Sequence, residues 1–221
     1  MSEFRLDWAS HAAAKYACEA WHYTGRIPPG TSVRIGVWED DRFIGVVVFS
    51  RGPSGHLGSA FGLDITQVCE LSRIALDDHE TPVTQIVSPA LRMLRQRCPG
   101  LRLVISFADP AQGHVGRIYQ AGNWIYLGRT APSKAHIDPE GRIRHDRNVS
   151  ASGFKSIFGK TTLVPPRDAC TPIELPGKFR YAMPLDKAMR RRLVPRALPY
   201  PQPSTEHDEA EETIDRLILT G

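Results

Sequence analysis

The sequence SFADPAQGHVGRIYQAGNW, residues 106–124, decides the fold of this 221-residue chain. The apolar residues 101–107 predict a buried strand, which Asp109 and Pro110 end by turning the chain. Two glycines follow, and then a helical turn that carries Tyr119. In an open α/β sheet, ligands bind outside the carboxyl ends of the strands. The stretch therefore predicts a strand, a turn and a short helix that together hold a carboxylate and a phenol at a site.

A structural interpretation of the same stretch stays open. Asp-Pro followed by two glycines is typical of an ordinary turn, and Tyr119 is also suited to a hydrophobic core. The residues alone do not decide between a site and a turn.

Helix and strand patterns alternate along the first 130 residues. Apolar positions recur at helical spacing after Ser10, a residue suited to cap a helix. Pro89 either begins its helix, with Ser88 as the cap, or kinks it. The expected strands cover residues 33–38, 43–49, 67–76, 101–107 and 124–127, and the expected helices run from Ser10 to about Gly25, over 86–94 and about His114. This order predicts an α/β fold with a central mixed sheet flanked by helices.

Size and composition are typical of a globular intracellular protein. The mass of 24.6 kDa fits one α/β domain with extensions. No apolar run reaches the roughly 18 residues of a membrane span, and the first residues lack a signal segment. We therefore expect a cytoplasmic protein with no membrane partner. The four cysteines form neither a C-x-x-C pair nor a zinc-ligand pattern, which indicates reduced thiols.

Proline and charge patterns divide the chain into a main domain and a tail. We expect residues 1–195 to form the domain, with a basic extension over about 130–195. Residues 196–221 are expected to form a flexible Pro-rich and acidic tail with a short helix. The tail either docks its acidic residues on the basic stretches, contacts a second subunit in a homodimer through its apolar positions, or frays.

Basic residues gather in the second half of the chain, although the net charge is only +4. Such clusters neutralise phosphates and position a nucleic-acid backbone. A solvated basic face is the alternative interpretation. The candidate phosphate contacts are Arg142, Arg144, Arg147, Lys155, Lys160, Lys178 and Arg180.

Three segments follow one another in a set order. They are His22-Tyr23 at the end of the first helix, Glu70-Leu71-Ser72-Arg73-Ile74-Ala75-Leu76 in a central strand, and the run from Asp109 to Gly128. In order and approximate spacing, these segments resemble the bacteriophage Mom DNA-modification family. The resemblance implies a GNAT-like acyltransferase fold that acts on double-stranded DNA in the host cytoplasm. It also implies conversion of adenine to N6-carbamoylmethyladenine, which blocks host restriction enzymes.

The implied reaction sets requirements for the site, because adenine N6 is a poor nucleophile inside a stacked duplex. The enzyme must extrude the base and hold it by stacking and hydrogen bonds. Asp109 is suited to be the base or orienter of the amine, and Tyr119 to be the proton donor or polariser. Arg73 needs either an anionic substrate or an ion pair within the sheet. The expected catalytic residues are Asp109, Tyr119, His22, Tyr23 and Arg73, and the expected substrate contacts beside them are Ser106, His114, Asn123 and Trp124.

The cofactor stays open at this point. The resemblance implies acyl-CoA or iron, and ligands for iron would come from His22, Asp109 and Tyr119. Pyrophosphate normally sits on exposed backbone N–H groups at a glycine-rich turn. The turn at residues 77–82 is acidic and contains no glycine, which argues against coenzyme A.

Two other functions are consistent with the same residues. One is a GNAT-like N-acyltransferase that acts on a small-molecule or protein amine. The other is a non-catalytic DNA-binding protein, in which Asp109 and Tyr119 are structural.

Overall fold

The computed structural model of the protein describes residues 3–52, 54–157 and 159–202. Two units are distinguished by their internal contacts. The first contains Met1–Ala108, Gly116–Gly128 and Arg180–Tyr200, and the second contains Asp109–Val115 and Arg129–Phe179. The tail helix expected near residues 214–218 lies outside the described residues.

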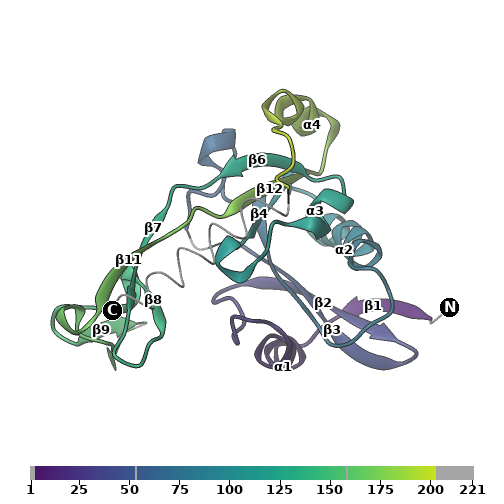
Figure 1. Ribbon diagram of the computed structural model, residues 1–221. Coiled ribbons are helices and arrows are strands. Elements are labelled where there is room, and N and C mark those ends of the chain that lie inside the picture. The colour runs from purple at the N-terminus through teal and green to yellow at the C-terminus, as the bar shows by residue number, and fades with distance from the viewer. Residues whose placement is uncertain (1–2, 53, 158, 203–221) are drawn as a thin grey trace. The chain divides into compact units, whose positions relative to one another are not determined.

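A mixed sheet forms the centre of the first unit (Figure 1). Its strand order is β1-β2-β3-β4-β5-β12-β6. The strands are β1 Phe4–Trp8, β2 Ser32–Glu39, β3 Arg42–Ser50, β4 Val68–Leu76, β5 Leu103–Ala108, β6 Ile125–Arg129 and β12 Phe179–Pro184. The expected α/β fold with a central mixed sheet is confirmed. The sequence analysis missed β1 and β12, and β12 lies between β5 and β6 although it follows them late in the chain.

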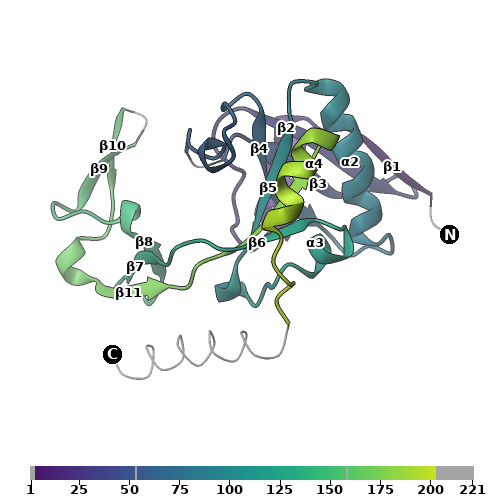
Figure 2. The same cartoon turned by 90° about the horizontal axis from the view of Figure 1, so that it is seen from above.

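Helices cover both faces of this sheet. Helix α1 (His11–Trp21) lies on one face, and α2 (Val83–Arg97) and α4 (Lys187–Leu193) lie on the other (Figures 1 and 2). Each face has its own buried cluster. On the α1 face the cluster contains Ala14, Ala17, Cys18, Val46, Val48 and Ala75. On the α4 face it includes Leu103, Ile105, Ala182, Met189 and Leu193.

The expected helix cap and hairpin are confirmed. Ser10 accepts a hydrogen bond from the Ala13 amide at 3.1 Å, which satisfies one of the free N–H groups at the start of α1. The helix ends at Trp21, four residues before the expected glycine. Asp40 and Asp41 have positive φ angles of 46° and 61°, the conformation that a tight two-residue hairpin turn requires.

Two helices begin at other residues than expected. The helix expected over residues 86–94 is present as α2, which begins at Val83, so Pro89 lies inside it and the alternative that Pro89 starts it is wrong. The burial of Ile86 and Val87 against the sheet extends the helix toward its N-terminus. The helix expected about His114 instead begins at Arg117 as α3 (Arg117–Ala121). It cannot begin earlier, because Gly116 has a φ of 83°, outside the right-handed helical region.

Strands β4 and β5 are parallel and pair only at their beginnings. The register runs from Val68 with Leu103 to Glu70 with Ile105. Beyond that point the two strands part, although β4 continues to Leu76 and β5 to Ala108. Ser106, the polar residue of β5 beyond Ile105, therefore lies where the ladder has ended.

The second unit is built on charge pairing as well as on strands. A three-stranded sheet has the order β11-β7-β8, from β7 Ser133–Ile137, β8 Ile143–His145 and β11 Thr171–Leu175. A separate hairpin pairs β9 Phe154–Ile157 with β10 Lys160–Leu163. The side chain of Asp138 is fully buried and accepts hydrogen bonds from Arg142 Nε at 3.0 Å and Arg144 Nε at 2.7 Å. Burial alone would raise the pKa of Asp138, but these arginines hold it well below its usual range.

Replacement of Gly116 by alanine tests the turn before α3. A Cβ at this position would overlap the Tyr181 ring, and the positive φ is unfavourable for an L side chain. We expect Gly116→Ala to reduce the free energy of unfolding by about 1–3 kcal/mol, as measured by urea denaturation. Gly100→Ala is the matched control, because a Cβ there meets no atom within 4 Å. Equal stability of the two variants would contradict this account.

Candidate active site

The Ser106 hydroxyl bridges the gap where β4 and β5 part. Ser106 is 1% exposed, and its Oγ lies 2.8 Å from the Leu71 carbonyl oxygen and 2.7 Å from the Tyr119 hydroxyl. The carbonyl can only accept, and serine has one proton to give. Ser106 Oγ is the donor in both contacts, so its proton is shared between the Leu71 carbonyl oxygen and the Tyr119 hydroxyl oxygen. The contact with Ser106 holds the Tyr119 hydroxyl in one position.

The Tyr119 side chain is a neutral phenol held in a buried place. Burial raises its pKa to about 12, and the charges of Tyr23 and Glu70 act in the same direction, while the hydrogen bond with Ser106 acts against them. The phenol therefore keeps its proton throughout the physiological pH range. Near neutral pH it is suited to donate or polarise through its hydrogen bond, and unsuited to act as a base.

Aromatic rings form the walls around Tyr119. The centroids of the Trp124 and Tyr181 rings each lie 5.1 Å from that of Tyr119. Gln120 donates to the Tyr181 hydroxyl at 3.1 Å. Trp124 is 1% exposed, so this expected substrate contact supports Tyr119 from the core, whereas Asn123 is exposed next to it. The sequence analysis missed Tyr181 because β12 was not anticipated.

His22 and Tyr23 lie together at the end of α1. Their rings are stacked with centroids 4.4 Å apart, and Tyr23 is 52% exposed. The Thr24 amide donates to His22 Nδ1 at 3.2 Å, so Nδ1 is the acceptor, and a neutral ring carries its proton on Nε2. The influence of Tyr23 on the pKa of Tyr119 places both residues in one electrostatic neighbourhood.

Glu70 is a site residue that the sequence analysis quoted only as part of a motif. Its charge contributes to the raised pKa of Tyr119. A Cβ built on Gly52 would lie 2.9 Å from Glu70 Oε2, so the glycine leaves space for the carboxylate. The presence of an acidic residue in the segment from Glu70 to Leu76 was the signal in the sequence that could have identified it.

Arg73 makes hydrogen bonds to carbonyl groups. Its Nη1 donates to the Ser72 oxygen at 2.6 Å and its Nε to the Arg26 oxygen at 3.2 Å. No carboxylate among the described residues pairs with it. The guanidinium thus keeps its positive charge uncompensated on the β4 strand.

Asp109 belongs to the second unit, where it pairs with a lysine. Its Oδ2 lies 2.5 Å from Lys178 Nζ, and its Oδ1 accepts from the Ala111 amide at 3.2 Å. The His114 amide donates to the Asp109 carbonyl at 3.1 Å, and the His114 side chain is exposed. The two contacts of the carboxylate hold it in one orientation.

The expected phosphate contacts differ in how much charge they have available. Arg142 and Arg144 bind Asp138, Lys178 binds Asp109, and Lys155 donates to the Arg147 carbonyl. Arg180 donates to the Leu127 carbonyl at 3.1 Å, and burial lowers its pKa. Within the described ranges, the side chains of Arg147 and Lys160 make no ion pair.

The residues considered for iron do not make a metal-binding group. In the described part of the chain, no three His, Cys, Asp or Glu side chains come together to hold a metal ion. Tyr119 is a neutral phenol that accepts a hydrogen bond from Ser106, whereas a phenol ligand would have to lose its proton. We therefore assign no metal ligand.

A carboxylate of the chain itself occupies the turn where coenzyme A pyrophosphate would bind. Glu39 accepts hydrogen bonds from the Thr81 amide at 2.6 Å and from the Glu80 amide at 3.1 Å, just before α2. Burial alone would raise the pKa of Glu39, but these hydrogen bonds lower it overall. The site does not fit coenzyme A, because the N–H groups are taken and the occupant is an anion.

These features define the class of protein. A mixed sheet whose parallel strands part beside a polar cluster, with helices on both faces, confirms the expected GNAT-like arrangement. Among solved structures of similar arrangement are a Bacillus subtilis acetyltransferase in complex with CoA and the AHL synthase LasI. The first is 14% identical with a TM-score of 0.44 and covers 84% of this chain and 100% of its own. The second is 11% identical with a TM-score of 0.43 and covers 91% and 100%.

The family follows from the sequence comparison. The Mom protein family profile matches residues 3–202, and the chain belongs to this family. A relative from Escherichia phage Mu, the methylcarbamoylase Mom, is 24% identical over 210 residues, which are 90% of this chain and 84% of the relative. The resemblance seen in the three motifs is thereby confirmed.

Glu39→Gln tests the occupied turn. The glutamine side chain has one acceptor oxygen and no negative charge, whereas the two oxygens of Glu39 each accept from a backbone N–H group. We therefore expect the free energy of unfolding at pH 7 to fall by about 1–2 kcal/mol. The folded-state pKa of Glu39 is lowered, so its contribution is present above the unfolded value of about 4.3 and fades as pH falls below it. Denaturation at pH 7 and pH 3 measures the difference.

The control for this variant is Glu19→Gln, because Glu19 is an exposed glutamate in a surface pair. It should leave the free energy of unfolding within about 0.5 kcal/mol of that of the parent.

Titration calorimetry of the parent with coenzyme A is expected to give no heat of binding. Saturable binding of coenzyme A to the parent would show that the Glu39 contact does not close the turn.

Proposed function

We propose that this chain is a phage transferase that converts adenine in double-stranded DNA to N6-carbamoylmethyladenine in the host cytoplasm. The product would protect phage DNA from host restriction enzymes. Membership of the Mom protein family and the likeness to the Mu methylcarbamoylase support this proposal. The observation that carries it is the neutral Tyr119 phenol, oriented by Ser106 and the Leu71 carbonyl in the electrostatic neighbourhood of Tyr23.

The exposed Tyr23 ring is suited to receive an extruded base. An adenine that leaves the duplex loses its stacking partners, and an aromatic ring replaces part of that energy. His22 backs the Tyr23 ring by stacking and is fixed by the Thr24 amide. In the proposed role, these two residues hold the base while Tyr119 polarises or protonates a polar group of the reactants.

The reaction requires a group that accepts a proton. In a displacement of this kind, a bond forms between adenine N6 and the methylene carbon of the carbamoylmethyl group. The bond from that carbon to the donor molecule breaks, its electron pair leaves with the donor, and N6 loses one proton. We assign this proton to the Asp109 carboxylate, which Lys178 and the Ala111 amide hold in position. Tyr119 is unsuited to this part, because its raised pKa keeps it protonated.

The described residues also bear on the partners. No helix within the described ranges is long and apolar enough to cross a membrane. Double-stranded DNA is the proposed macromolecular substrate, and the expected homodimer stays a prediction.

Tyr119→Phe and Asp109→Asn test the proposed roles. Each keeps the size of the side chain and removes one function, so we expect the modified adenine to fall by about 10²-fold or more. Mass spectrometry of nucleosides from plasmid DNA of expressing cells measures the product. In the parent, it should reveal an adenine nucleoside heavier by one carbamoylmethyl group.

Tyr16→Phe is the matched control, because Tyr16 is 58% exposed on α1 and takes no part in the hydrogen bonds of Ser106. It should modify DNA as well as the parent. Full modification by Tyr119→Phe would refute the role of the phenol. Unmodified DNA from folded parent protein would refute the proposed reaction.

A further inference from the structure

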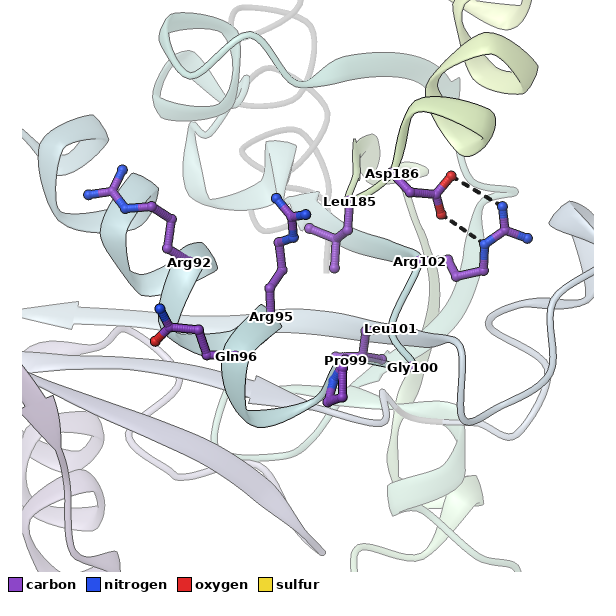
Figure 3. Close-up of a pocket in the computed structure, with 9 residues that line it drawn as sticks. All are labelled: Arg92, Arg95, Gln96, Pro99, Gly100, Leu101, Arg102, Leu185 and Asp186. Carbon is purple, nitrogen blue, oxygen red and sulfur yellow. Dashed lines mark hydrogen bonds and ion pairs between the residues drawn. The ribbon is translucent and has the colours of Figure 1, made fainter.

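A hollow of about 640 Å³ lies at the C-terminal end of α2, where the chain turns toward β5 (Figure 3). Its floor contains the turn before β5, and the segment before α4 closes one side. Arg92 and Arg95 both project from α2, and the Arg92 guanidinium is turned away from that of Arg95 (Figure 3). The residues around the hollow are Arg92, Arg95, Gln96, Gly100, Arg102 and Asp186, together with apolar neighbours.

The positive charge in this hollow is largely uncommitted. Arg102 forms two hydrogen bonds with Asp186, at 2.8 and 3.2 Å, and the two charges cancel. Arg92 and Arg95 make no hydrogen bond or ion pair within the part of the chain that the structure describes, and both are exposed. The hollow therefore carries a net positive charge from two guanidinium groups.

A second hollow of about 480 Å³ continues the first along α2. Arg92 lines both of them, and the second also contains Gln85, Ser88 and Asn123. Gln85, Ser88, Arg92 and Arg95 recur at spacings of three and four residues, which places them on one face of the helix. We call the two hollows together the α2 groove.

The length of the α2 groove fits an extended ligand. From Gln85 to Gln96 the helix rises about 16 Å at 1.5 Å per residue, which equals the rise of about five nucleotides along one DNA strand. At its far end, the groove reaches Gly122 and Asn123, which directly follow the helix that carries Tyr119. The groove thus runs from the C-terminal end of α3 to Arg92 and Arg95, and the Tyr119 side chain itself does not line it.

We propose that the α2 groove binds the phosphodiester backbone of double-stranded DNA, with Arg92 and Arg95 as the phosphate contacts. This inference rests on the proposed function for its partner. Guanidinium groups bind phosphate oxygens in a bidentate manner. The polar lining residues on the same helix, Gln85, Ser88 and Gln96, are neutral donors, and the one carboxylate of the lining, Asp186, is paired with Arg102. The groove is open and runs along a helix, which suits a polymer backbone.

Three of the basic residues that were expected to contact phosphates already have partners. Arg142, Arg144 and Lys178 are engaged with carboxylates of the chain itself, whereas Arg147 and Lys160 make no ion pair within the described ranges. To contact DNA, these three side chains would have to exchange a carboxylate for a phosphate, which reduces the favourable free energy of binding. Arg92 and Arg95 lose no such partner.

The test is the salt dependence of DNA binding by the full chain. Fluorescence anisotropy with a labelled 20-base-pair duplex should show the affinity of Arg92→Ala/Arg95→Ala reduced at least tenfold near 0.1 M salt. The slope of log K against log salt concentration should fall in magnitude by about 1.8, because two phosphate contacts are lost. Arg97→Ala is the matched control, since Arg97 is an exposed arginine of α2 that lines neither hollow.

The outcomes separate this inference from the proposed function. An unchanged DNA affinity and salt slope in the double variant would overturn the proposal that the α2 groove binds DNA. An equal loss of affinity in Arg97→Ala would overturn it too, even if the parent modifies DNA in cells. A loss specific to the double variant would support the groove, even if the nucleosides from those cells are unmodified. Failure of the parent to bind the duplex at 50 mM salt would overturn the inference outright.

Discussion

The early separation of β4 and β5 is the constraint on which the candidate site depends. Parallel strands satisfy each other's backbone groups only while they pair, and here pairing stops at Glu70 and Ile105. The Leu71 carbonyl oxygen accepts a hydrogen bond from the Ser106 hydroxyl. A buried backbone carbonyl needs such a partner, and this need holds the Ser106 side chain in place. Tyr119 completes the arrangement. A requirement of the fold thus becomes the device that orients a phenol.

The chain uses its own carboxylates to bind backbone amides and arginines of its own. Glu39 covers the amides before α2, and Asp138 gathers two arginines in the second unit. Both carboxylates have pKa values below their ordinary range, because several donors converge on each of them. Charged groups that stabilise the structure, such as Glu39 and Asp138, are therefore distinct from exposed charged groups such as Arg92 and Arg95, which have no ion-pair partner among the described residues.

Local patterns in the sequence predicted much of the fold. The Ser10 cap, the hairpin between β2 and β3, and the strand that leads to Asp109 depend on neighbouring residues, so they could be read directly. The insertion of β12 could not, because a strand formed by residues 179–184 pairs with strands more than fifty residues earlier. For the site, Ser106, Tyr119 and Tyr23 were anticipated from motifs. The partners of Asp109 and Glu39 depend on contacts distant in sequence, which no spacing rule contains.

The place of β12 has a consequence for how the protein is made. Tyr181 lies on this strand and packs against the Tyr119 ring, yet it leaves the ribosome more than sixty residues after Tyr119. A nascent chain that has completed β5, α3 and β6 still lacks the strand between them. The central sheet around Tyr119 is therefore completed only late in synthesis, and a product that ends before residue 179 lacks the strand that packs against this ring.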